Sequence, residues 1–149
     1  MNVTRKGAVI FGLIGGIVFA KPNDYTLFIP NGIEIALSFF GAAINILVLL
    51  GVVLVYNKLL PSLLSNEWHM PHEKIPPFNV WSEPVNFFHF CGVVFTSLGI
   101  SGSLISLLFS TVPFLVTLQI ILIGLGTLAG VKIVPYAFPN QVKYYSNHE

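Results

Sequence analysis

Long apolar runs separated by short polar stretches dominate this sequence of 149 residues. At 1.5 Å per residue, a helix of about 20 apolar residues crosses the hydrocarbon core of a bilayer. Four runs predict membrane helices, at about residues 7–22, 33–56, 85–109 and 113–134. Only three residues separate the last two runs, so they should form an antiparallel hairpin. The pattern predicts an all-α fold, a polytopic membrane helix bundle in which residues 1–149 form a single integral membrane domain.

The first run has two interpretations, because its apolar part (residues 7–20) would be only about 21 Å long as a helix. Arg5 and Lys6, the apolar stretch and the small residue Ala20 match a secretory signal that is cleaved after Ala20. We favour a retained helix, because three glycines would give it a close-packing face. These glycines are Gly12, Gly15 and Gly16.

Composition supports a membrane location. Hydrophobic residues make up 54% of the chain and charged residues 9%, whereas a water-soluble domain averages about 25% charged residues. Intrinsic disorder is excluded by the same hydrophobicity. The formal net charge of +1 leaves no basic surface for a phosphate backbone. The expected partner is the lipid bilayer, and nucleic acid is not expected.

The basic residues predict the orientation. With four spans, six of the seven basic residues lie on one side of the membrane, and only Lys21 lies on the other. Lys and Arg accumulate on the cytoplasmic side of membrane proteins. We therefore expect a bacterial inner-membrane protein whose N-terminus, central loop (about residues 57–84) and C-terminus are cytoplasmic. The six residues are Arg5, Lys6, Lys58, Lys74, Lys132 and Lys143.

One segment of the central loop contains several potential metal ligands. Two imidazoles and two carboxylates occur within seven residues, at Glu67, His69, His72 and Glu73, and these groups suit zinc, copper or nickel. Pro71 prevents the helical spacing of an HExxH motif, and no second cluster completes a tetrahedral site. We expect no metal and no cofactor, with His69 and His72 as the weak candidates.

Polar groups inside a membrane are costly and therefore suggest function. Glu34, His89 and Lys132 lie within about two turns of a span end, where they can reach interfacial water. A haem site at His89 would need a second histidine inside the bundle, and the other histidines lie outside it. Asn45 lies near the middle of its span, so its amide must find a hydrogen-bond partner. An interhelical bond is favoured over a polar pathway.

Small residues form faces on the last two spans. The third span has Thr96, Gly99, Ser103 and Ser106 at spacings of three and four, and the fourth has a GxxxG motif at Gly126 and Gly130. Such faces let helix backbones approach closely. They predict packing within the monomer, or an interface with another chain, which is either a copy of this protein or a different membrane protein.

No nucleophile motif of the GxSxG or SxxK type occurs, so an enzyme is not expected. The leading hypothesis is a non-enzymatic accessory or toxin-immunity protein that binds another membrane component. One alternative is a homo-oligomeric channel or small transporter whose pathway uses Asn45 and the Ser/Thr face of the third span. Another is a membrane-surface metal-binding protein or enzyme that uses His69 and His72.

Overall fold

The computed structural model describes residues 3–20, 29–60, 67–71, 83–110 and 112–144. It contains four helices, α1 (Val3–Phe19), α2 (Gly32–Leu59), α3 (Pro84–Phe109) and α4 (Phe114–Ala137), and two short strands, β1 (Trp68–His69) and β2 (Val142–Lys143). Helices α2, α3 and α4 are long and apolar enough to cross a membrane, and α1 is a shorter apolar helix. The predicted all-α membrane fold is confirmed.

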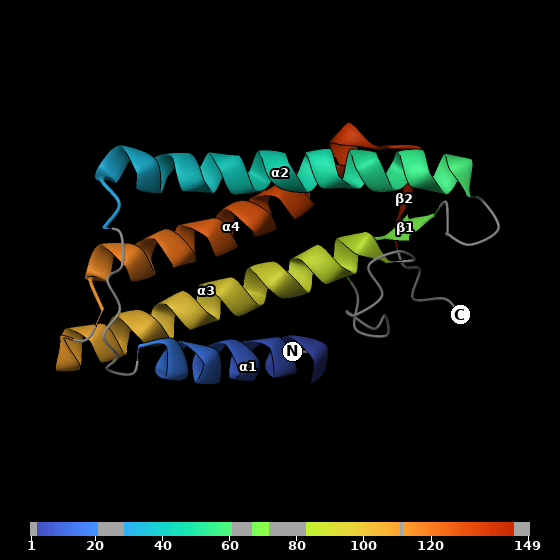
Figure 1. Cartoon of the computed structure of the whole chain (residues 1–149). Helices are drawn as coiled ribbons and strands as arrows, with labels where there is room; N and C mark the ends of the chain where they lie inside the picture. Colours follow the sequence, from blue (N-terminus) through green and yellow to red (C-terminus); the bar gives the residue numbers. More distant parts are fainter. Residues whose placement is uncertain (1–2, 21–28, 61–66, 72–82, 111, 145–149) are drawn as a thin grey trace.

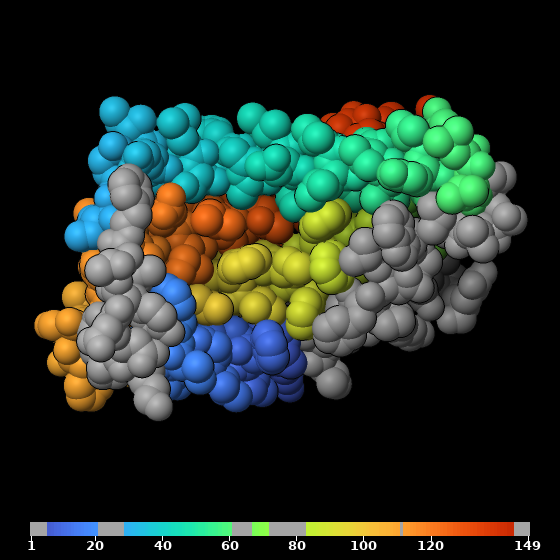
Figure 2. All heavy atoms as spheres, viewed as in Figure 1, coloured from blue at the N-terminus to red at the C-terminus, as the bar shows by residue number. Residues whose placement is uncertain are grey.

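The four helices lie in one row, in the spatial order α1, α3, α4, α2 (Figure 1). Helices α3 and α4 pack on each other in the middle, α1 packs on α3, and α2 packs on α4. Contacts between α2 and α3 are few. Figure 2 shows the same order in space-filling form, with α2 and α1 at the two edges. Each edge helix therefore has only one extensive helix neighbour in the described part of the chain.

The helices of the row share two ends along their axes, and these two ends differ in charge. Lys58 in the last turn of α2, Lys132 near the end of α4, and Lys143 in β2 lie at one end, which we call the basic end. The other end, the hairpin end, contains the short connection between α3 and α4. There Ser110 ends α3 in the left-handed conformation, with φ of 52°, and α4 begins at Phe114. The predicted antiparallel hairpin is therefore present.

Helix α1 turns its small residues toward α3. Ala8, Gly12, Gly16 and Ala20 follow one another at intervals of four, and all four are buried. Residues four apart share one face of a helix. Two of the three glycines expected to form a close-packing face thus belong to it, and Gly15 lies beside it, partly exposed.

Glycines also bring α3, α4 and α2 together. A Cβ on Gly99 of α3 would lie 2.8 Å from the amide nitrogen of Ile121 on α4. A Cβ on Gly130 of α4 would lie 2.9 Å from the carbonyl oxygen of Ala43 on α2. Both distances are shorter than real Cβ contacts. The backbones therefore approach as closely as only glycine permits, which is how membrane helices gain packing energy without a hydrophobic driving force.

Two helix ends depend on features that hydropathy does not report. Helix α2 begins with a capping box, in which the Asn31 side chain accepts from the Glu34 amide at 2.9 Å and the Glu34 carboxylate accepts from the Asn31 amide at 2.8 Å. Glu34 is thus part of a helix cap. Helix α4 continues through Pro135 to Ala137, beyond the expected end at residue 134. The Phe138 amide still donates to the Val134 carbonyl at 2.8 Å, so the last turn remains closed.

A small folded cluster covers the basic end. Strands β1 and β2 are parallel and pair Trp68 with Val142 and His69 with Lys143. Trp68 is fully buried and meets the Phe138 ring edge-on, with ring centroids 5.6 Å apart. The segment between α2 and α3 is thereby joined to the segment that follows α4.

Candidate functional site

The small-residue faces of α3 and α4 are used inside the protein. Ser101 on α3 donates to the Leu13 carbonyl of α1 at 2.9 Å. Ser103 donates to the Gly99 carbonyl within α3 at 2.7 Å, and both residues are buried. On α4, Gly126 lies against the backbone of Phe39 on α2. These faces are therefore not free to bind another chain in this conformation.

Asn45 has a different environment. It lies at the centre of α2, thirteen residues after Gly32 and fourteen before Leu59, and it is exposed. Its side chain makes no hydrogen bond with any residue that the structure describes. A partner for this amide is therefore not found among the described residues, and the expected interhelical bond stays a prediction.

A shallow groove of about 270 Å³ surrounds Asn45 between α2 and α4. We call it the outer groove, and its lining residues are Ser38, Gly41, Ala42, Asn45 and Ile123. A Cβ on Gly41 would meet no atom within 4 Å, so space is open there. At the hairpin side, the Gln119 amide donates to the Ser38 hydroxyl at 2.8 Å. The groove thus combines small residues, open space and polar groups on the outside of a membrane helix.

At the basic end, His69 is paired with a carboxylate. Its Nδ1 lies 2.8 Å from Oε1 of Glu83, and its backbone amide donates to Oε2 of the same residue at 3.2 Å. The Asn86 amide donates to the His69 carbonyl at 3.1 Å. His72, the other weak metal candidate, lies outside the described residues. No group of three or more potential metal ligands occurs in the described part of the chain.

A second ion pair connects the strand region at the basic end. The Lys143 ammonium donates to Oε1 of Glu67, and both side chains are exposed. This hydrogen bond, together with the positive charge of Lys143, lowers the pKa of Glu67 below its usual value. Such exposed pairs contribute little to stability. They do help to orient the segments that carry them.

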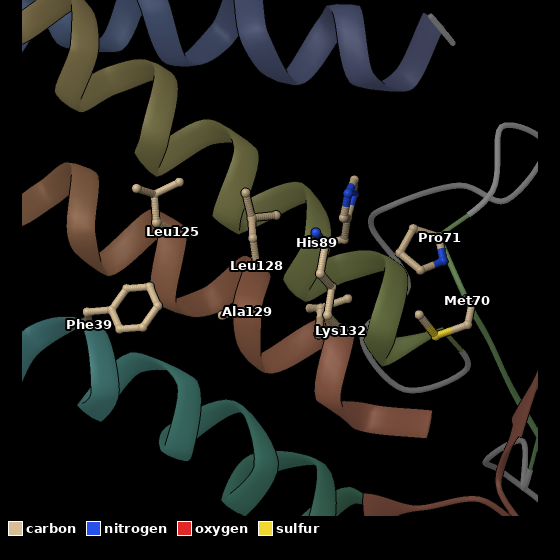
Figure 3. A pocket seen from close by; sticks show the side chains of 9 residues that line it. Phe39, Met70, Pro71, His89, Leu125, Leu128, Ala129 and Lys132 are labelled. Atoms are coloured by element: carbon tan, nitrogen blue, oxygen red, sulfur yellow. The ribbon is translucent and has the colours of Figure 1, made fainter. Parts of the chain in front are cut away.

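His89 and Lys132 line the same pocket (Figure 3). His89 belongs to α3 and Lys132 to α4, and in Figure 3 the lysine side chain extends from α4 in the direction of the imidazole. The pocket has a volume of about 590 Å³. His89 is half-buried and Lys132 is exposed. The structure thus brings together two of the three ionisable groups that the sequence places inside the predicted spans.

Several residues that shape these sites were not identified from the sequence. Glu83 directly precedes α3 and pairs with a histidine fourteen positions away, which no local pattern indicates. Gln119 is a second such residue, because its polar side chain lies inside a span and bonds to Ser38 of another helix. The capping box at Asn31 does have a sequence signal, namely a capping residue followed three positions later by glutamate.

Comparisons with protein-family models, with curated proteins and with solved structures find no match. The functional interpretation therefore depends on the geometry of the outer groove and of the basic end.

Proposed function

We propose that this protein is a non-enzymatic accessory protein of the bacterial inner membrane, with both termini in the cytoplasm, that binds a different membrane protein. The outer groove is where a transmembrane helix of that partner docks. Asn45 carries this proposal, because its exposed amide lies at the centre of a membrane helix with no hydrogen-bond partner among the described residues.

Energetics favour an occupant that can form hydrogen bonds. An amide without a partner costs several kcal/mol in hydrocarbon. Hydrogen bonds between membrane helices contribute roughly 0.6 to 2 kcal/mol. Gly41 lies four residues before Asn45, on the same face, with open space above it. A partner helix could therefore approach closely at Gly41 and satisfy Asn45. The partner should carry a small residue and a polar side chain at the same depth.

A photo-crosslinking residue at position 41, introduced in cells, tests this proposal. We expect a distinct membrane protein to be crosslinked in a fixed ratio. The change Asn45→Leu should release it and Asn45→Gln, which keeps an amide, should largely restore it. The matched control is a crosslinker at Phe40, which is exposed and, as the residue before Gly41, lies at nearly the same depth about 100° round α2. Equal crosslinking from both positions, or indifference to Asn45→Leu, would contradict the proposal.

The toxin-immunity variant of this function makes a separate prediction. Deletion of the protein should harm cells only when a cognate toxin is present. Growth of the deletion strain with and without a toxin-producing competitor measures this, and a loss of fitness without any competitor would count against the variant.

One observation favours a homo-oligomeric channel or transporter as the second candidate. An amide is both donor and acceptor, so Asn45 of two copies can pair across a symmetry axis. The described helices lie in a row and not around a central space, and the Ser/Thr face of α3 packs on α1 and α4. Several copies would have to enclose the pathway. Crosslinks from position 41 to copies of the chain alone, with flux lost in Asn45→Leu vesicles, would support this candidate over the accessory protein.

A further inference from the structure

The pocket that contains His89 and Lys132 is amphipathic. Apolar side chains form most of its wall, among them Phe39 of α2 and Leu125 and Leu128 of α4. Its volume of about 590 Å³ is within the range of small-molecule binding sites. No carboxylate lines it among the described residues. The pocket therefore offers an apolar surface and, at Lys132, a positively charged hydrogen-bond donor.

The polar and apolar parts of the pocket are separated along the axis of α4. His89 lies five residues after the start of α3, and Lys132 lies five residues before the end of α4. At 1.5 Å per residue, both are about 7.5 Å from the basic end of their helices. Leu125 lies seven residues before Lys132, which places it about 10 Å deeper. Figure 3 shows Leu125, Leu128 and Lys132 following one another along α4.

We propose that this pocket binds an anionic amphiphile of the bilayer, a lipid whose acidic headgroup contacts Lys132 and His89 while its alkyl chain lies along Leu125, Leu128 and Phe39. The ammonium of Lys132 donates up to three hydrogen bonds. Such bonds to an anion are stronger than those between neutral groups. Lys132 lies nearer the basic end of α4 than Leu125 and Leu128, so the charged and apolar parts of the pocket follow one another in the order of a headgroup and its chain.

The site is closed toward the basic end by Met70 and Pro71, which also line the pocket. Met70 is held there because its amide donates to the Lys143 carbonyl at 3.1 Å. A free inorganic anion would leave the apolar wall unoccupied, and an uncharged amphiphile would leave Lys132 without a counter-ion. Only a molecule with both parts satisfies both surfaces. This inference is independent of the outer groove, which has a different lining.

The test uses purified full-length protein in an uncharged maltoside detergent, with dodecyl phosphate as the probe. Native mass spectrometry counts bound probe, and a titration gives its affinity. We expect one equivalent of dodecyl phosphate to bind, and inorganic phosphate neither to bind nor to compete. Phosphatidylglycerol should displace the probe, and diacylglycerol, which has the same chains and no phosphate, should do so at least about ten-fold less well, as expected when charge-assisted hydrogen bonds are lost.

Substitutions at two positions of the pocket, Lys132 and Ala129, locate the site. Lys132→Gln should weaken dodecyl phosphate binding about ten-fold, and Lys132→Arg should retain it. The matched control is Lys58→Gln, which removes a cation from the same end of the row without touching the pocket. Ala129→Phe should block the alkyl chain, because Ala129 lines the cavity. Thermal unfolding establishes that each variant is folded.

Three results would overturn the inference. The first is equal competition by inorganic phosphate, which would indicate a site for the anion alone. The second is equal displacement by phosphatidylglycerol and diacylglycerol, which needs no variant and would indicate a site indifferent to charge. The third is an equal loss of affinity in Lys58→Gln and Lys132→Gln, which would indicate attraction to the basic end in general.

Discussion

The contact between α1 and α3 gives a sharp test of the packing, because α3 is the only extensive helix neighbour of α1 in the part of the chain that the structure describes. The perturbation is Gly16→Ala, which adds a single methyl group. A Cβ at this position would overlap the Ser101 hydroxyl and the Leu98 carbonyl oxygen and would lie 2.9 Å from the Gly102 amide nitrogen. Two of these three atoms belong to the backbone of α3, so the helices must separate.

Three contributions determine how much Gly16→Ala changes the free energy of unfolding. Overpacking of this kind costs about 1 to 3 kcal/mol. Separation also weakens the hydrogen bond from Ser101 to the Leu13 carbonyl, which contributes about 0.6 kcal/mol in a membrane. Alanine is a better helix former than glycine and offsets up to about 1 kcal/mol. We expect Gly16→Ala to lower the free energy of unfolding by about 0.5 to 2.5 kcal/mol.

Two other glycines of α1 are matched controls. A Cβ on Gly7 would meet no atom within 4 Å, and one on Gly15 would lie 3.4 Å from the flexible Leu98 side chain. Gly7→Ala and Gly15→Ala should therefore be neutral or stabilising. Unfolding can be followed with a thiol-reactive dye on Cys91, the single and half-buried cysteine of the chain. The reasoning is refuted if Gly16→Ala is as stable as these two variants.

Further predictions concern the basic end and the contact between α4 and α2. The pKa of Glu67 is lowered in the folded protein. Its ion pair therefore stabilises the fold at pH values above the unfolded pKa, and this stabilisation is lost as pH falls through the folded pKa. Glu67→Gln should flatten this acid dependence when the free energy of unfolding is measured against pH. Glu83→Gln removes the carboxylate that pairs with His69 and should lower the free energy of unfolding, measured by denaturant titration, by about 1 kcal/mol. Gly126→Ala should destabilise the protein by denaturant unfolding, whereas Gly32→Ala, in open space, should not.

Much of the fold could be predicted because hydropathy and length determine membrane helices directly. The predicted spans 33–56 and 85–109 agree with α2 and α3 to within three residues at each end. The row order could not be predicted, because every side of these helices is apolar and periodicity does not identify the buried one. Glycine spacing identified the close-packing faces, but not which helix lies opposite each of them. The pairing of β1 with β2 involves two residues in each strand, separated by more than seventy positions.

The candidate sites were predicted unevenly for a related reason. Asn45 and His89 are identifiable from the sequence, because a polar group inside a span is rare and costly. Their surroundings depend on which helices are neighbours. His89 and Lys132 line one pocket because α3 packs on α4. Asn45 remains exposed because it lies on a side of an edge helix that no described helix covers. The sequence contains the polar residues, but the tertiary arrangement determines their partners.

The two edges of the row are not equivalent, and this difference supports docking at α2. Helix α1 directs its small residues to α3 and exposes large apolar side chains, such as Phe11 and Val18, each 66% exposed. Such a surface suits lipid. Helix α2 exposes Asn45 and an open Gly41, which lipid tails cannot satisfy. A photo-crosslinking residue at position 11 should therefore capture lipid, whereas one at position 41 should capture protein. Capture of the same protein from both positions would mean that the edges do not differ in this way.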